Sequence, residues 1–222
     1  MARGPLLIGI GGTVAALVAY FVWKRGQTAA GPVQAGASAG DVGEVQPVSE
    51  TEKSKSGIGN QYDALISSVA NAENVDPVLL KAIVATETDF DEEAVNPEQS
   101  FTLNGVSYSP SDGRGRKALR DFIAAGGDPA SIGLNPSLGL AQVRVGNGKH
   151  FIPGLQALEL FDPQTNLTAS SRLLRELVHA GVTLETIDAY NVGQGRVLSG
   201  ELRNLPYRDK AKRNYAIFQT DF

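Results

Sequence analysis

The sequence predicts an α+β fold that is mainly α, with one small β-hairpin, preceded by one N-terminal transmembrane helix. Three observations predict it. Residues 6–23 form an uncharged apolar run, residues 26–60 contain no Leu, Met or aromatic residue, and residues 61–222 alternate helical apolar patterns with turn residues. Apolar residues make up 42% of the 222 residues and charged residues 20%. This composition is typical of globular proteins and argues against a fully disordered chain.

The apolar run from Leu6 to Trp23 has 18 residues and no charged side chain. As a helix it would measure about 27 Å, which is close to the thickness of the hydrocarbon core of a bilayer. Aromatic residues gather at its end, where a membrane interface favours them. We therefore expect residues 1–25 to be a transmembrane anchor, with an orientation that charge does not decide. A cleaved signal peptide stays open, because Ala35-Gly36-Ala37 resembles a cleavage site.

Residues 26–60 are predicted to be a flexible linker. Seven of these 35 residues are Gly, five are Ala and four are Ser, and none is Leu, Met or aromatic. Such a segment cannot bury enough apolar surface to offset the entropy of ordering its backbone. The remaining residues, 61–222, are long enough to fold as a domain of their own.

The charge and the rare residue types exclude several functions. The net charge is -4 at pH 7, so the chain has no general attraction for nucleic acid, and we expect no nucleic-acid partner. No Cys is present, which excludes disulfides, Cys-ligated metals and a Cys nucleophile. With only two His residues, we expect no metal site and no cofactor.

The first two helices of the domain contain the most informative residue. Apolar spacing predicts a helix over residues 62–73, and Asp76-Pro77 is a typical start for the next one. Four side chains share one face of this second helix: Leu80, Ile83, Val84 and Glu87. A carboxyl on such a face is normally paired or functional, and burial raises its pKa. The alternative is that the helix ends by Thr86 and leaves Glu87 exposed.

The later elements follow in order along the chain. Two β-prone runs, residues 101–103 and 106–108, flank Asn104-Gly105 and predict a hairpin. A short amphipathic helix is expected over residues 117–125. Start and stop signals then predict three more helices: from Asp162-Pro163 to Gly181, from Thr183 to near Tyr190, and from Pro206 to Gln219.

Four motifs occur in a fixed order within this helical framework. They are Glu87-Thr88-Asp89-Phe90, Ser137-Leu138-Gly139-Leu140-Ala141-Gln142-Val143, Phe161-Asp162-Pro163-Gln164-Thr165-Asn166-Leu167, and Ala189-Tyr190-Asn191-Val192-Gly193-Gln194-Gly195-Arg196-Val197. Over residues 61–219 the order resembles the catalytic domain of the soluble lytic transglycosylase family, which has a lysozyme-like fold. Two departures stand out: Ala141 replaces a usual Met, and residues 98–136 form an insertion.

The resemblance implies a reaction and a set of site residues. It implies cleavage of the MurNAc–GlcNAc β-1,4 bond of peptidoglycan, with formation of 1,6-anhydroMurNAc and with Glu87 as acid and then base. It implies five substrate-binding residues: Gln142, Tyr190, Asn191, Thr88 and Gly139. Two alternatives stay open, a muramidase that hydrolyses the same bond and a non-catalytic wall-binding subunit.

Hydrolysis of the lysozyme type usually needs a second carboxylate across the bond. The acidic residues considered for this role are Asp89, Asp91, Glu92, Glu93 and Asp112. We expect the first four to be a solvated acidic helix end, and Asp112 to serve turn chemistry.

The expected partners are peptidoglycan glycan strands and a membrane bound through residues 6–23. We expect a membrane-anchored protein with its catalytic domain facing the peptidoglycan. Two settings stay open. We favour a phage virion, in particular one with an internal membrane, and the other is a secretion or conjugation machine of the cell envelope. Either setting would add other virion or envelope proteins as partners.

Overall fold

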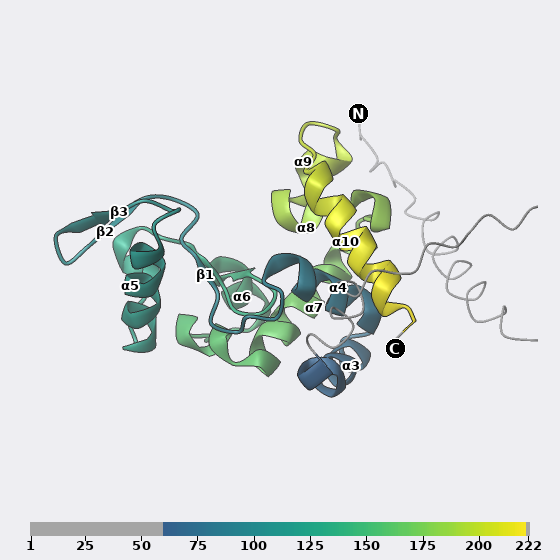
Figure 1. The fold of residues 1–222 in the computed structure, drawn as a ribbon, viewed down its shortest axis with the longest axis horizontal. Helices are drawn as coiled ribbons and strands as arrows, with labels where there is room; N and C mark the ends of the chain where they lie inside the picture. The colour runs from purple at the N-terminus through teal and green to yellow at the C-terminus, as the bar shows by residue number, and fades with distance from the viewer. Residues whose placement is uncertain (1–59, 221–222) are drawn as a thin grey trace, which may run out of the picture. The chain divides into compact units, whose positions relative to one another are not determined.

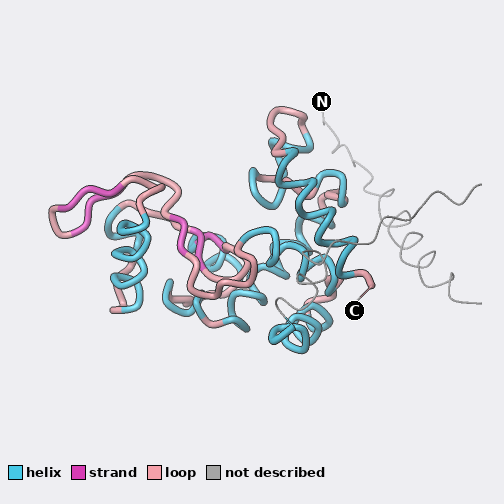
Figure 2. The backbone as a smooth tube through the Cα atoms, viewed as in Figure 1, coloured by secondary structure: helices cyan, strands magenta, loops and turns pink. Residues whose placement is uncertain are grey.

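The computed structural model describes residues 60–220, so the predicted anchor and nearly all of the predicted linker lie outside the described residues. Within residues 60–220, no helix is both long and apolar enough to cross a membrane. Helices dominate this part of the chain and strands are short (Figure 2). The α+β prediction, mainly α with a small hairpin, is confirmed for residues 60–220.

Helix α4 (Pro77–Glu87) lies at the centre of the packing and is preceded by η1 (Asn60–Tyr62) and α3 (Asp63–Ala72). It begins as predicted: Asp76 is the N-cap, and its carboxylate accepts a 2.9 Å hydrogen bond from the backbone N–H of Val78. Six consecutive side chains, from residue 80 to residue 85, are buried. Helices α3, α7 and α10 pack around α4 (Figure 1), so the end of α4 is held from several sides.

The later helices largely follow the predicted boundaries. Helix α7 (Pro163–His179) is capped by Asp162, and α10 (Leu205–Phe218) closes the domain. The helix expected from Thr183 is instead split into η4 (Leu184–Thr186) and α8 (Ala189–Val192). Asp188, which lies between them, is buried and paired with Arg203. Short helices that were not predicted include α6 (Val145–Phe151), η3 (Ala157–Phe161) and α9 (Gln194–Leu198).

The predicted hairpin is confirmed as β2 (Phe101–Leu103) paired with β3 (Val106–Tyr108). Asn104 and Gly105 have φ angles of 51° and 79°, as a type I′ turn requires. A second antiparallel sheet was missed; its strand order is β1 (Val95–Asn96), β4 (Ser137–Leu138), β5 (Val143–Arg144). Each of its strands has two residues, too few to show an alternating pattern.

The inserted segment, residues 98–136, contains the hairpin, α5 (Gly113–Ala124) and η2 (Pro129–Ile132). Helix α5 starts four residues earlier than predicted, because Asp112 is its N-cap and accepts a hydrogen bond from the backbone N–H of Arg114. Figure 1 shows β2, β3 and α5 grouped together, apart from α8, α9 and α10. A 2.7 Å ion pair between Arg120 and Glu93 ties α5 to the segment after α4.

Candidate active site

Glu87 is the last residue of α4, and the alternative that the helix ends before it is wrong. Leu80, Ile83 and Val84 on the same face are fully buried, so the predicted stripe carries the carboxyl toward the interior. Burial raises the pKa of Glu87 to about 7, although the hydrogen bond from Tyr207 and the charge of Lys210 lower it. A carboxyl with this pKa changes protonation state near neutral pH, as acid–base catalysis requires.

Helix α10 holds the end of α4 through three side chains. The Tyr207 hydroxyl donates a 2.8 Å hydrogen bond to Oε1 of Glu87. Lys210 donates through Nζ to the backbone carbonyl of Thr86 at 2.6 Å, and Asn214 donates to the Thr86 hydroxyl at 3.0 Å. The carbonyls in the last turn of a helix lack partners within that helix. Lys210 therefore caps α4 while Tyr207 fixes the orientation of the carboxyl.

The start of α10 is fixed by an ion pair between the buried Asp188 and the more exposed Arg203. Both Asp188 oxygens accept hydrogen bonds from Arg203, at 2.8 and 2.9 Å, and one also accepts from the backbone N–H of Asn204. Burial would raise the pKa of Asp188, but these hydrogen bonds hold it below its usual value. Asn204 in turn caps α10, by accepting from the backbone N–H of Tyr207. The chain Asp188–Asn204–Tyr207 thus connects a buried charge to the Glu87 carboxyl.

The turn between β4 and β5 packs against Thr88, the residue that follows Glu87. The Thr88 hydroxyl donates a 2.7 Å hydrogen bond to the carbonyl of Leu140. Within the turn, Gly139 has φ of 70°, and a Cβ added there would lie 2.3 Å from the carbonyl oxygen of Leu160. Only glycine fits this position. Thr88 and Gly139 thus set the backbone geometry around the site.

Asn166 of α7 holds the same turn from the other side. Its side chain is fully buried and makes three hydrogen bonds, to the carbonyls of Leu138 and Leu160 and from the N–H of Ala141. All the polar atoms of the amide are therefore used, which is the condition for burying it without cost. Asn166 belongs to the third of the four sequence motifs, which did not predict a role for it. The sequence does contain an indication of this role, because Asn166 is a polar residue on the buried face of α7, near its start.

Tyr190 bridges this turn to α7. Its hydroxyl donates to the carbonyl of Ala141 at 2.8 Å and lies 3.0 Å from the Ser170 hydroxyl, which is therefore the donor in that second bond. Burial, and then the charge of Glu87, raise the pKa of Tyr190 above its usual range. The phenol stays protonated and acts as a donor at physiological pH.

A cavity of about 550 Å³ contains the Glu87 carboxyl. Its lining comes from two parts of the chain and is predominantly polar. The sheet, its connections and α6 supply Asn96, Glu98, Asn135, Ser137, Gln142, Arg144 and Asn147. Helices α7, α8 and α9 and the segment after α9 supply Leu173, Tyr190, Asn191, Val192, Gly193, Arg196 and Leu202. A cavity with so many amide, hydroxyl and charged groups suits a polar polymer such as a glycan.

The predicted site residues divide into two groups. Gln142, Tyr190 and Asn191 line the cavity together with Glu87. The Gln142 amide donates to the carbonyls of Ala94 and Gly139, and Asn191 accepts from Asn204. Thr88 and Gly139 are not among the lining residues, and their contacts are with the backbone of the β4–β5 region.

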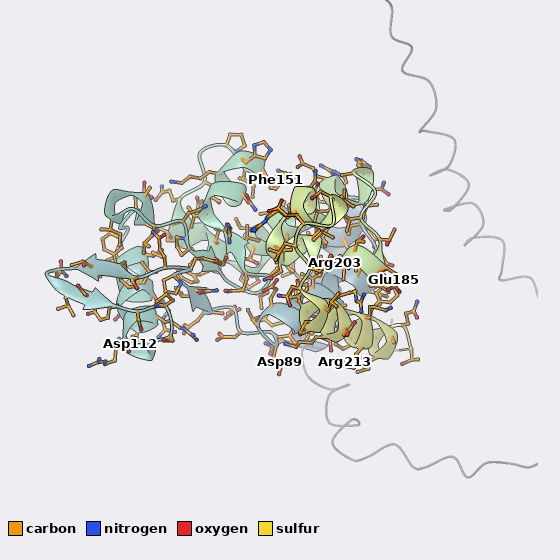
Figure 3. All side chains as sticks on the ribbon, turned by 90° about the horizontal axis from the view of Figure 1, so that it is seen from above. Asp89, Asp112, Phe151, Glu185, Arg203 and Arg213 are labelled. Carbon is orange, nitrogen blue, oxygen red and sulfur yellow. The ribbon has the colours of Figure 1, made fainter. Side chains whose placement is uncertain are left out.

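None of the five acidic residues considered as a second carboxylate lines this cavity. Glu92 accepts a hydrogen bond from Tyr62, Glu93 pairs with Arg120, and Asp112 caps α5. Figure 3 shows Asp112 on the side of the inserted segment, away from Asp89. The acidic residue that does line the cavity beside Glu87 is Glu98, which the sequence reasoning missed.

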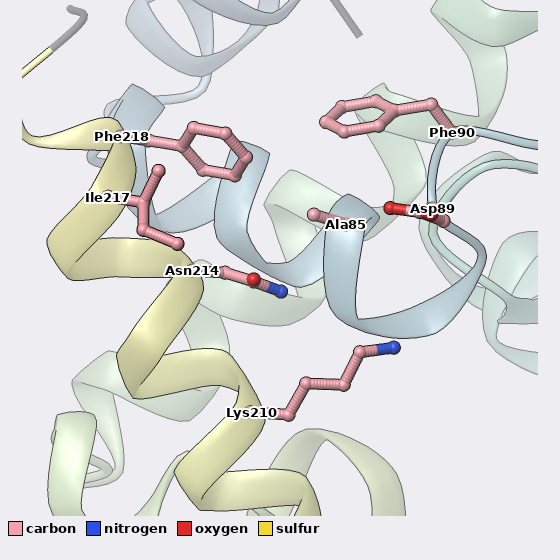
Figure 4. A pocket seen from close by; sticks show the side chains of 7 residues that line it. All are labelled: Ala85, Asp89, Phe90, Lys210, Asn214, Ile217 and Phe218. Atoms are coloured by element: carbon pink, nitrogen blue, oxygen red, sulfur yellow. The ribbon is translucent and has the colours of Figure 1, made fainter. Parts of the chain in front are cut away.

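Asp89 instead lines a second, smaller cavity of about 110 Å³ between α4 and α10. Figure 4 shows the Phe90 and Phe218 rings on one side of it and Lys210 on the opposite side, with Asp89 beside Phe90. Glu87 is not among its lining residues. The larger cavity is therefore the candidate active site.

Backbone strain gathers around this site. Asp89, Phe90, Glu98 and Gln142 all have φ between 47° and 70°, a region that side chains other than Gly and Asn rarely occupy. Such residues persist where the surrounding structure over-determines them, and they cluster at functional sites. Among residues 60–220, no group of three or more His, Asp and Glu side chains is arranged to hold a metal ion.

The fold and the site together define a class of protein. A mainly helical domain with small antiparallel sheets is consistent with a lysozyme-like fold, and a partly buried acid in a polar cavity suits cleavage of a glycan. The sequence model of the Transglycosylase SLT domain matches residues 64–213, and the chain belongs to this family. Membership supports lytic transglycosylase activity on peptidoglycan. Comparison with curated proteins and with solved structures gave no match.

Proposed function

We propose that this chain is a membrane-anchored lytic transglycosylase, which cleaves the MurNAc–GlcNAc β-1,4 bond and forms 1,6-anhydroMurNAc. One observation carries the proposal. The Glu87 carboxyl lies in the 550 Å³ polar cavity with a pKa of about 7, and Tyr207 holds it in one orientation. A single carboxyl with this pKa can give a proton and later take one at neutral pH.

The proposed reaction has two proton transfers at Glu87. In the first, protonated Glu87 donates to the glycosidic oxygen as the bond from C1 of MurNAc breaks. The positive charge on C1 is shared by the N-acetyl group of the substrate. In the second, the ionised Glu87 takes the proton of the C6 hydroxyl, whose oxygen bonds to C1 and closes the anhydro ring. A nucleophile on the same sugar has a high effective molarity, so water is not required.

Hydrolysis of the same bond is the second candidate function, and Glu98 is the observation that favours it. Glu98 lines the cavity with Glu87, and two carboxyls flanking one glycosidic bond are the usual machinery of hydrolysis. The two reactions differ in their products. A hydrolysed strand ends in a reducing sugar, whereas the transglycosylase product ends in an anhydro ring and is lighter by one water.

The experiment compares the full chain with Glu87→Gln on purified peptidoglycan, with mass spectrometry of the released fragments. We expect anhydro products from the wild type and loss of at least about 99% of the activity in Glu87→Gln. Glu93→Gln is the matched control, because Glu93 is an exposed carboxylate paired with Arg120, outside the cavity. Reducing-end products alone would favour the muramidase. Retained activity in Glu87→Gln would remove Glu87 from the mechanism, and no products from the wild type would favour a non-catalytic subunit.

The proposed setting is a membrane next to peptidoglycan. The 18-residue uncharged run at residues 6–23 supports the anchor through its length and composition. We favour a phage virion with an internal membrane, in which an anchored enzyme would open the wall locally during entry. Detection of the chain in purified virions by mass spectrometry tests this setting. Its detection in a bacterial envelope complex instead would favour a secretion or conjugation machine.

A further inference from the structure

Glu98 occupies an unusual place in the cavity. It comes two residues after β1, at the first position of the inserted segment, and its φ of 67° lies in the left-handed region. Its side chain lines the cavity that contains Glu87. A non-glycine residue in this backbone conformation is strained, and strain of this kind is a reason to look for a function.

Three groups hold the Glu98 side chain and backbone in place. The buried Ser137 hydroxyl donates a 2.7 Å hydrogen bond to Oε1, and Arg144 donates a 2.9 Å hydrogen bond to Oε2. The backbone N–H of Glu98 donates to the Asn96 side-chain oxygen at 3.2 Å. The Glu98 side chain keeps 32% of its surface exposed. The carboxylate is therefore fixed in position and still accessible from the cavity.

We propose that Glu98 is a second functional carboxylate of this active site, held by Ser137 and Arg144 so that its negative charge acts on Glu87 and on the sugar bound beside it. The proposal rests on the proposed function, because it assumes that Glu87 cleaves a glycan in this cavity. It assigns to the inserted segment a part in the chemistry, in addition to forming a wall of the cavity.

Two physical effects follow from this placement. A fixed negative charge in the cavity stabilises the positive charge that develops on C1 as the bond breaks. It also opposes ionisation of the neighbouring acid. Burial has the largest effect on the pKa of Glu87 and raises it, and the groups that also act on it are Tyr207 and Lys210 of α10, and Glu98. Among them the charge of Glu98 raises the pKa of Glu87, whereas the Tyr207 hydrogen bond and Lys210 lower it. The charged side chains of Arg144 and Arg196 line the same cavity.

The test is Glu98→Gln in the full chain, which keeps the size of the side chain and an oxygen that can accept from Ser137. Rates are measured on soluble glycan strands prepared from peptidoglycan, between pH 5 and pH 9. We expect the maximal rate to fall about tenfold with little change in KM. We expect the high-pH limb of kcat/KM to move down by about half a pH unit, because Glu87 then loses its proton more easily.

Three controls separate this role from a structural one. Glu98→Asp keeps the charge and should restore the high-pH limb even if the rate recovers only in part. Glu93→Gln removes a charge outside the cavity and should change neither the rate nor the limb. Glu87→Gln should be inactive in the same assay. If Glu87→Gln keeps its activity, the proposed function is overturned and Glu98 has no reaction to act on. An unchanged pH profile in Glu98→Gln, with or without lower thermal stability, overturns the proposal for Glu98 while the proposed function stands.

Discussion

Replacing Glu87 by Gln should make the protein more stable at alkaline pH while it abolishes activity. Glu87 is held in a partly buried position at the end of α4, where desolvation disfavours its ionised form. Gln has nearly the same size, carries no charge and can still accept the Tyr207 hydrogen bond through its oxygen. The substitution therefore removes the cost of burying a charge and leaves the packing of the apolar stripe unchanged.

The magnitude follows from the difference between the folded and unfolded pKa of Glu87, about 7 against 4.5. Below pH 4.5 the carboxyl is protonated in both states and costs nothing. Between pH 4.5 and pH 7 only the unfolded chain ionises, so the stability of the wild type falls as pH rises. Above pH 7 the cost is constant, at about 3 kcal/mol. Between pH 5 and pH 8 this cost rises by about 2–3 kcal/mol. The change corresponds to roughly 5–10 °C in Tm for a domain of this size.

The assay is thermal unfolding of the full-length wild type and Glu87→Gln, followed by circular dichroism at pH 5 and pH 8. Every other titrating group is the same in both proteins, so it cancels when the pH dependence of one is subtracted from that of the other. The variant should gain stability over the wild type as the pH is raised from 5 to 8. Glu93→Gln is the control, because the Glu93 side chain is largely exposed. The difference in stability between Glu93→Gln and the wild type should therefore show no effect of burying a charge.

One result would refute the reasoning. If the stabilities of the wild type and Glu87→Gln run parallel from pH 5 to pH 8, the Glu87 carboxyl has an ordinary pKa in the folded protein. The carboxyl would then be ionised at neutral pH and unable to protonate a leaving group efficiently. The proposed mechanism would lose its acid, even if the variant were inactive.

Two further predictions concern the turn and the anchor. Gly139→Ala should destabilise the domain by at least about 3 kcal/mol in denaturant unfolding, because its Cβ would lie 2.3 Å from the Leu160 carbonyl oxygen and 2.4 Å from the Asn166 amide nitrogen; a loss below about 1 kcal/mol would mean that the turn can shift. A chain that starts at Ile58 should be soluble and active, whereas the full chain should partition into a detergent phase. A mature N-terminus at Ser38, detected by mass spectrometry, would replace the anchor with a cleaved signal peptide.

The sequence predicted Glu87 because the evidence for it is local. Helical periodicity places Glu87 on the same face as Leu80, Ile83 and Val84, and the Asp76-Pro77 start signal fixes the register of the helix. The hairpin was predicted for the same reason, since an Asn-Gly pair determines its own turn. Both features depend on residues within about ten positions of each other.

Glu98 and Tyr207 could not be assigned their roles in this way. Tyr207 lies 120 residues after Glu87, and only the packing of α10 on α4 brings the two side chains together. Glu98 depends on Ser137, which is 39 residues away across the insertion, and on pairing between two-residue strands. No periodic pattern records such contacts, because each involves a single residue pair set by the tertiary fold.

These non-local contacts offset the free-energy cost of burying the Glu87 carboxyl and of the left-handed backbone that follows it. The end of α4 carries a partly buried carboxyl at Glu87, and two left-handed residues, Asp89 and Phe90, follow shortly after it. It would tend to unwind if nothing else held it, since the last turn of a helix is its least stable part. Lys210 donates to the Thr86 carbonyl in the last turn, and Thr88 donates to the Leu140 carbonyl in the β4–β5 turn. The acid therefore depends for its position on segments that adopt their geometry only when the whole domain has folded. It follows that a folded domain is needed for activity, and that a weakened contact in α10 or in the β4–β5 turn should lower activity before it unfolds the protein.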